Sequence, residues 1–149
     1  MINFEQPMFR PPSEANSLLV QATVGCSHNS CTYCAMYRQS NQKFRMRSEK
    51  EILQIIAENS SSSYEKAFIA DGNALVLPVK LLVKTIKTIY ASNQNVRQVS
   101  IYGNVGDILR KKPQELKELA ASGLDMVYIG FESGDDITLK RIKKGANKS

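Results

Sequence analysis

Three cysteines, the only ones in the chain, lie within nine residues. They are Cys26, Cys31 and Cys34, spaced C-x4-C-x2-C. Buried cysteines usually occur singly in hydrophobic cores, so packing does not explain three of them in one short loop. Closely spaced thiolates are typical ligands of zinc or of an iron–sulfur cluster. The cysteine loop (residues 25–34) is therefore the first candidate for chemistry.

Zinc and an iron–sulfur cluster differ in the ligands that they need. Zinc needs a fourth ligand, and His28, the single histidine, lies between two of the cysteines. Chelation of one ion by His28 and both neighbouring cysteines would be cramped in so short a loop. A four-iron cluster has four corners, so three cysteines leave one iron open for a non-protein ligand. The residues favour the cluster, and a zinc-stabilised binding module stays as the alternative.

The elements that must position this loop alternate between strand and helix. Four short apolar or alternating segments predict strands at 18–24, 67–70, 96–102 and 124–131. Helical patterns follow them: one starts at the capping box of Ser48 and Glu51, and the others cover about 78–90, 113–123 and 135–144. Helical crossovers imply an α/β fold whose parallel sheet has about four strand–helix units.

Two architectures satisfy this order, a four-stranded doubly wound sheet and half of a β/α barrel. Both bind ligands beyond the carboxyl ends of the strands. The chemically interesting residues of this chain lie at those ends, as Gly25-Cys26, Asp71-Gly72-Asn73, Gly103-Asn104 and Glu132-Ser133. The first 16 residues are rich in Pro, Ser and Asn and predict an irregular segment before a single domain.

The cysteine loop resembles that of the radical S-adenosylmethionine (radical SAM) superfamily, whose three cysteines have an aromatic residue just before the third. Tyr33 occupies that position, although the first gap has four residues where the commonest family spacing has three. Residues 128–134 are similar to the fourth-strand segment of these enzymes. Residues 139–145 are similar to the following helix in a bacterial and archaeal branch of iron–sulfur oxidoreductases. The resemblance covers about residues 10–147.

The resemblance implies two cofactors, a 4Fe–4S cluster and S-adenosylmethionine (SAM). Cys26, Cys31 and Cys34 would hold the cluster, and its open iron would bind SAM. The reduced cluster would cleave SAM to a 5′-deoxyadenosyl radical, which takes hydrogen from a substrate that the sequence does not identify. An electron donor such as flavodoxin or ferredoxin would be a partner.

The resemblance also implies SAM contacts at the strand ends and in the cysteine loop. The residues concerned are Tyr33, Asp71, Gly72, Asn73, Asn104, Glu132 and Ser133. Asp71-Gly72-Asn73 stands where the family usually has a Gly-Gly-Glu type of turn. Each role has a structural alternative: Tyr33 as a cover for the cluster, Asp71-Gly72 as an ordinary turn, and Ser133 or Asp135 as a helix N-cap.

The family core normally has six strand–helix units, so the resemblance implies a partial TIM-type barrel. On this interpretation residues 17–149 form a radical SAM core domain that is truncated relative to the family. An open last strand would allow self-association through the sheet edge. A non-catalytic fragment of a radical SAM enzyme is a further alternative.

The amino-acid composition limits the classes of protein and of binding partner that remain. With 42% hydrophobic and 23% charged residues, the chain can bury a core. Much of the +6 net charge lies in the last ten residues and indicates a solvated helix face and tail, with Lys140, Arg141, Lys143, Lys144 and Lys148. The aromatic and basic patterning of nucleic-acid binding is absent. Without a signal sequence or membrane span we expect a cytoplasmic protein, in which clustered cysteines serve metal binding or catalysis.

Overall fold

The computed structural model describes residues 2–38 and 43–149, and its main element is a sheet of four parallel strands. The strand order is β1 (Leu18–Gln21), β4 (Lys66–Ala70), β5 (Gln98–Gly103) and β6 (Leu124–Ile129). In the described residues the sheet is open and does not close into a barrel, which agrees with the predicted partial barrel. The α/β fold and the parallel sheet are thus confirmed.

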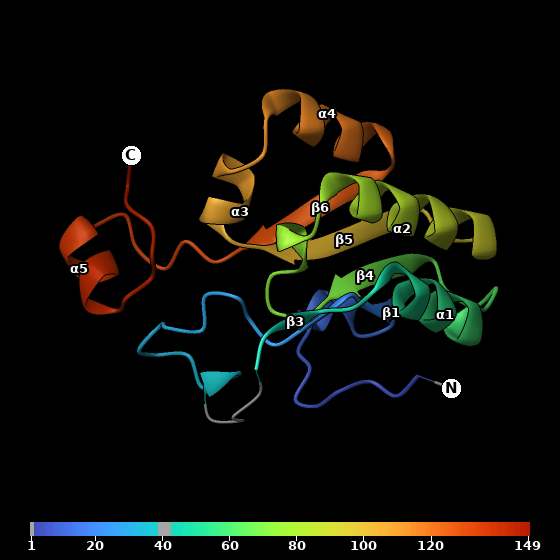
Figure 1. Ribbon diagram of the computed structural model, residues 1–149, viewed down its shortest axis with the longest axis horizontal. Helices are drawn as coiled ribbons and strands as arrows, with labels where there is room; N and C mark the ends of the chain where they lie inside the picture. Colours follow the sequence, from blue (N-terminus) through green and yellow to red (C-terminus); the bar gives the residue numbers. More distant parts are fainter. Residues whose placement is uncertain (1, 39–42) are drawn as a thin grey trace.

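Three helices connect the strands and lie on one face of the sheet (Figure 1). They are α1 (Glu49–Asn59), α2 (Val79–Ser92) and α4 (Pro113–Ala121). The strands follow one another across the sheet in chain order, so right-handed crossovers place all three helices on the same side. None of the helices in residues 2–38 and 43–149 is long and apolar enough to cross a membrane.

Local sequence explains where these helices begin and end. Ser48 caps α1: its side chain accepts a hydrogen bond from the Glu51 N–H, and Glu51 accepts one from the Ser48 N–H in return. Pro113 occupies the first turn of α4, where its missing N–H costs nothing. Gly123, with a φ of +101°, then turns the chain into β6.

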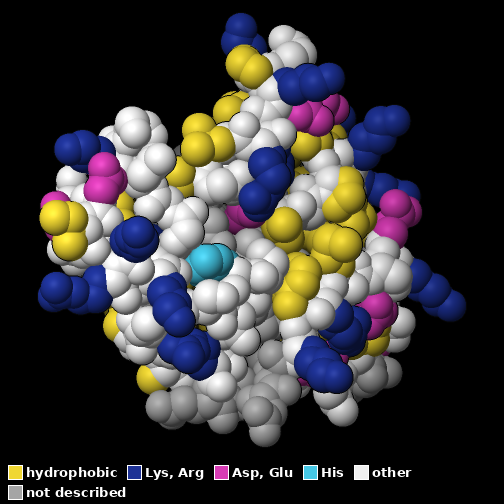
Figure 2. All heavy atoms as spheres, turned by 60° about the vertical axis from the view of Figure 1, so that its left-hand side comes forward, with side chains coloured by type: hydrophobic (Ala, Val, Ile, Leu, Met, Phe, Trp, Pro, Cys, Tyr) yellow, Lys and Arg dark blue, Asp and Glu magenta, His cyan; other side chains and the backbone are white. Residues whose placement is uncertain are grey.

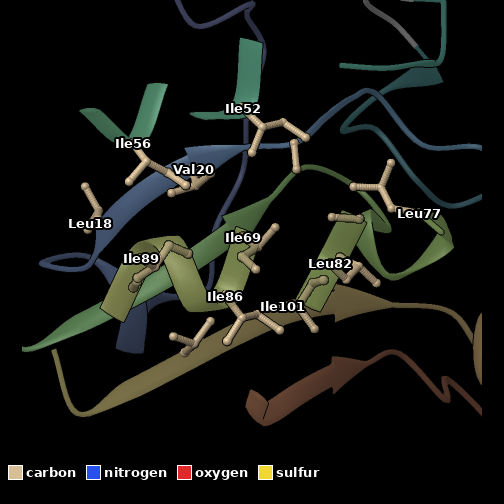
Figure 3. Packing of buried hydrophobic residues seen from close by; sticks show 14 of the residues in the cluster. Leu18, Val20, Ile52, Ile56, Ile69, Leu77, Leu82, Ile86, Ile89 and Ile101 are labelled. Atoms are coloured by element: carbon tan, nitrogen blue, oxygen red, sulfur yellow. The ribbon is translucent and has the colours of Figure 1, made fainter. Parts of the chain in front are cut away.

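The hydrophobic core lies between these helices and the sheet (Figure 3). Ile52 and Ile56 of α1 and Leu82, Ile86 and Ile89 of α2 are fully buried. They pack against fully buried side chains of the strands, among them Val20, Ile69 and Ile101. Each such side chain stabilises the fold by about 1.5–3 kcal/mol. This core fixes the strand ends that carry the candidate site.

The opposite face of the sheet carries aromatic side chains. Phe68, Tyr102 and Tyr128 contact one another edge to face, with ring centroids 5.0–6.1 Å apart. Glu14 of the short helix η1 (Pro12–Glu14) is fully buried and accepts a hydrogen bond of 2.8 Å from the Tyr128 hydroxyl. The residues of η1 therefore pack against the sheet.

Several elements differ from the sequence-based expectation. The predicted strand 18–24 is two strands, because β2 (Thr23–Val24) leaves the main sheet and pairs with β3 (Arg45–Met46). The short helices η3 (Ala74–Val76) and α3 (Val105–Leu109) follow β4 and β5 and were not predicted. Elements of two to five residues are too short for a periodic pattern to reveal.

The last helix is also shorter than expected. It was predicted over 135–144, whereas α5 (Asp136–Arg141) is six residues long. Lys143 and Gly145 have φ values of +53° and +73°, which a right-handed helix does not accommodate. The chain therefore leaves the helix at Ile142 and turns toward the cysteine loop.

Candidate functional site

The cysteine loop begins directly after β2, beyond the carboxyl end of β1, and its three thiols are free and partly buried. The Cys34 N–H donates a 3.3 Å hydrogen bond to the Cys31 carbonyl oxygen, which makes a turn between the two cysteines. Burial raises the pKa of the Cys31 thiol, Lys144 opposes the rise, and Cys26 and Cys34 add to it. The three sulfurs therefore share one electrostatic environment.

The described side chains form no site for a single metal ion, because no three His, Cys, Asp or Glu side chains among them come close enough to hold one. In a four-iron cluster each cysteine binds a different iron, so the sulfurs are spread more widely than around zinc. His28, the fourth ligand of the zinc alternative, has its Nε2 2.7 Å from the carbonyl oxygen of Lys143. Three partly buried thiols in one loop thus fit a cluster with one open iron.

The turn after β4 packs directly beneath the first cysteine. A β carbon added to Gly72 would lie 2.6 Å from the Gly25 carbonyl oxygen and 2.8 Å from both Cα and Cβ of Cys26. Real Cβ atoms do not approach other heavy atoms so closely. Gly72 is therefore needed for the close approach of the turn to the cysteine loop.

Asp71 ties the same turn to the end of the loop. Its carboxylate is fully buried and accepts hydrogen bonds from the Tyr37 hydroxyl and, at 2.9 Å, from the Gly72 N–H. Burial raises the pKa of Asp71, and these two donors lower it. Tyr37 lies three residues after Cys34, and sequence reasoning did not single it out. The Tyr37–Asp71 pair fixes the chain where it leaves the loop.

Asn73 fixes the chain where it enters the loop. Its Oδ1 accepts a 2.9 Å hydrogen bond from the Ser27 N–H, and its Nδ2 donates to Ser27 Oγ at 2.7 Å. The same Nδ2 donates at 3.0 Å to Asp107 of α3, which is almost fully buried. Asp107 also accepts from the Asn104 N–H, at 2.9 Å. The ends of β4 and β5 therefore brace the residue that follows Cys26.

Glu132, Tyr33 and Lys144 meet on the other side of the loop. The Lys144 Nζ lies 3.2 Å from Glu132 Oε1 and 3.2 Å from the Tyr33 hydroxyl oxygen. Tyr33 and Lys144 lower the pKa of the Glu132 carboxyl. Lys144 was expected on a solvated face, yet only 12% of its side chain is exposed. Its hydrogen bond to Tyr33 joins residues 111 positions apart in the sequence, so the basic composition of the tail did not reveal this environment.

The other predicted contact residues have local roles at helix starts. Asn104 is the N-cap of α3, and the Ser133 Oγ accepts a 3.0 Å hydrogen bond from the Asp135 N–H. Asp135 caps α5 by accepting from the Thr138 N–H at 2.8 Å. The structure thus shows the N-cap alternative for Asp135. SAM contacts at these positions stay a prediction.

A hollow of about 750 Å³ lies beside the loop. The cysteine loop, α3 and the segment after α5 line it, with His28, Ser30, Gly106, Leu109 and Gly145. A smaller one, of about 190 Å³, adjoins Ser27, Asn104 and Lys144. Figure 2 shows this face, where several Lys and Arg side chains lie on one side of the single histidine, coloured cyan, and hydrophobic side chains lie on the other. A ligand above the loop would therefore meet a positively charged surface.

The chain thus combines a parallel α/β sheet with a three-cysteine loop at the carboxyl ends of its strands. The family model of the radical SAM superfamily matches residues 20–149. The chain therefore belongs to the radical SAM superfamily.

Two relatives, both named "Probable GTP 3',8-cyclase", come from two strains of Methanococcus maripaludis. One is 25% identical over 135 residues, which cover 90% of this chain and 42% of the relative. The other is 27% identical over 117 residues, which cover 78% and 37%. The chain thus spans less than half the length of these relatives.

Two solved structures of the cobalamin-dependent S-adenosylmethionine radical enzyme OxsB resemble the chain. The form with aqua-cobalamin has a TM-score of 0.64 at 18% identity, over 87% of this chain and 20% of that one. The form with aqua-cobalamin and S-adenosylmethionine has a TM-score of 0.59 at 20% identity, over the same shares. At these identities the likeness shows the fold.

Proposed function

We propose that this chain carries the cofactor-binding part of a radical SAM enzyme, with a 4Fe–4S cluster on Cys26, Cys31 and Cys34 and SAM on the open iron. The observation that carries this proposal is the contact of Gly72 and Asn73 with Cys26 and Ser27, because it makes the β4 end and the cysteine loop one unit. When bound, the two cofactors supply the reductive cleavage of the sulfonium bond, which gives a 5′-deoxyadenosyl radical.

The protein's own contribution is to hold the loop in one geometry. Asn73 fixes its start, and Tyr37 with Asp71 fixes the chain after its end. Partial burial limits the access of water to the thiols, and such burial tunes the potential of a cluster. These bonds at both ends of the loop reduce the ordering that cluster binding would require.

The predicted SAM contacts divide into two groups by exposure. Asp71 and Asn73 are fully buried and act on the loop from beneath. Tyr33 is 49% exposed and the Glu132 side chain 34% exposed, so both are open to a ligand. We therefore assign the direct contacts to Tyr33, Glu132 and Asn104, the last of which lines the smaller hollow. Gly72 and Ser133 would contribute through their backbone.

The substrate and the electron donor are part of the same proposal. A one-electron carrier such as flavodoxin or ferredoxin would reduce the cluster. The names of the two relatives make GTP the first candidate substrate to add to an assay.

Anaerobic reconstitution with iron and sulfide tests the proposal. The reconstituted protein is given dithionite and SAM, and 5′-deoxyadenosine is measured by chromatography. We expect about four irons per chain, absorption from thiolate–iron bands and formation of 5′-deoxyadenosine. Cys31→Ala should abolish the product, because it removes one ligand of the cluster.

A Cys31→Ala variant that still makes the product would overturn the assignment. One colourless zinc ion per chain, with no iron or sulfide, would support the binding-module alternative instead. Measuring iron, zinc and sulfide in the same sample separates these outcomes.

A further inference from the structure

Residues 142–145, here called the C-terminal clasp, contact the cysteine loop at successive positions. The Ile142 carbonyl oxygen accepts a 2.9 Å hydrogen bond from the Thr32 N–H, and the Lys143 carbonyl oxygen lies 2.7 Å from His28 Nε2. A β carbon on Gly145 would lie 2.6 Å from the His28 ring. The clasp therefore lies against the stretch that separates the three cysteines.

Lys144 is the one charged side chain of the clasp that points to the loop and is largely shielded from solvent. Its Nζ lies 5.9 Å from the centroid of the Tyr33 ring, and Tyr33 stands between Cys31 and Cys34 in the chain. Glu132 and the Tyr33 hydroxyl hold the ammonium group at 3.2 Å each. Lys140, in the last turn of α5, is exposed. The two lysines thus share a segment but differ in environment.

The charge of Lys144 lies beside the cysteine loop. Its ammonium group is held 3.2 Å from the hydroxyl of Tyr33, which lies between Cys31 and Cys34 in the chain. A positive charge in a partly buried setting interacts with thiolates several times more strongly than in bulk water.

We propose that Lys144 is a positioning residue of the cluster site: Glu132 and Tyr33 hold its ammonium group against the cysteine loop, where it stabilises the gathered thiolates and the reduced state of the cluster. This inference rests on the proposed function, because it needs a cluster on the three cysteines. Reduction adds one negative charge to the cluster, so a nearby cation favours the reduced form.

The test compares Lys144→Met with Lys144→Arg and Lys140→Met. Methionine keeps most of the length of the side chain and removes the charge, while the backbone contacts of Ile142 and Lys143 are left in place. The four reconstituted proteins are poised at a series of potentials, and the reduced cluster is counted by electron paramagnetic resonance. We expect the ratio of reduced to oxidised cluster at a fixed potential to fall about tenfold in Lys144→Met, which is a shift of about 59 mV for one electron. Lys144→Arg should restore the ratio, and Lys140→Met should match the wild type.

Iron uptake and circular dichroism keep the test decisive if Lys144→Met binds little cluster. The proposal is supported if Lys144→Met alone loses iron, while its apoprotein unfolds at an unchanged temperature and Lys144→Arg takes up iron normally. A Lys144→Met cluster with the wild-type potential overturns it, as does an equal shift in Lys140→Met or a loss of iron that accompanies a lower melting temperature. A wild-type protein that takes up no iron and sulfide would instead overturn the proposed function, and this inference with it.

Discussion

Replacing Gly72 by alanine tests the packing on which the site is built. The added methyl group would meet the Gly25 carbonyl oxygen at 2.6 Å and the Cys26 Cα and Cβ at 2.8 Å. Ordinary contact begins at 3.4 Å, so the loop must move away by about 0.6–0.8 Å. Two of these three atoms belong to the backbone, which cannot rotate out of the way as a flexible side chain does.

The expected cost has two parts. Overpacking of this kind costs about 1–3 kcal/mol of unfolding free energy. The φ of Gly72 is outside the left-handed region, so alanine adds no strain of its own there. Metal sites tolerate ligand displacements of only about 0.2 Å, so the displaced Cys26 should bind its iron poorly. We expect the variant to keep its fold and to lose most of its cluster.

Gly134→Ala is the matched control, because a β carbon on Gly134 has no heavy atom within 4 Å and its φ is not positive. It should bind a full cluster and be neutral or up to about 1 kcal/mol more stable. Urea unfolding of both apoproteins and iron and sulfide per reconstituted chain provide the measurement. If Gly72→Ala unfolds and binds iron as Gly134→Ala does, the reasoning about this contact is wrong.

Three further predictions concern the bonds around the loop. Asn73→Ala should lower the unfolding free energy by about 1–3 kcal/mol and reduce iron uptake, because it leaves the Ser27 N–H and Asp107 with fewer hydrogen-bond partners. Urea unfolding measures this change, and Asn147→Ala, at an exposed residue, is the control. Tyr37→Phe should lower the unfolding free energy by about 1–3 kcal/mol, because buried Asp71 loses a hydrogen-bond donor. Tyr33→Phe, at a half-exposed ring, should lower it by less than about 0.5 kcal/mol in the same urea unfolding measurement. The Ser48 N–H and, less strongly, Arg45 lower the pKa of Glu51 from 4.5 to about 2. The Glu51 carboxylate therefore stabilises α1 fully above pH 4.5, and this stabilisation is lost as the pH falls toward 2. Glu51→Gln should accordingly be about 0.5–1 kcal/mol less stable than the wild type at pH 6 and nearly equal to it at pH 2; a difference that does not change with pH would contradict this pKa.

Much of the fold follows from patterns within short stretches of the chain. The apolar stripe of α1 and its capping box at Ser48, and the start of α4 at Pro113, were predicted from neighbouring residues alone and are confirmed. The split between β1 and β2 was not, because it depends on the pairing of Thr23 and Val24 with Arg45 and Met46 some twenty residues later. Helix periodicity likewise extended α5 to Lys144, although the chain leaves the helix to contact the loop.

The sequence likewise predicted one part of the candidate site and not the other. Cysteine spacing predicted that Cys26, Cys31 and Cys34 are the cluster ligands, and the rule that parallel strands end at one edge predicted that Asp71, Asn104 and Glu132 lie near them. The sequence did not show that Asn73 bonds to Ser27, that Tyr37 bonds to Asp71, or that Lys144 bonds to Tyr33.

Spacing and composition thus predicted which sulfurs would bind a metal group and at which edge of the sheet they lie, because both predictions follow from covalent order and local periodicity. The tertiary structure decided what holds that edge in place. Contacts such as those of Gly72 with Cys26, or of Gly145 with His28, join segments 46 and 117 positions apart. Only the packing of the whole core brings such segments within van der Waals distance, and no local pattern in the chain records it.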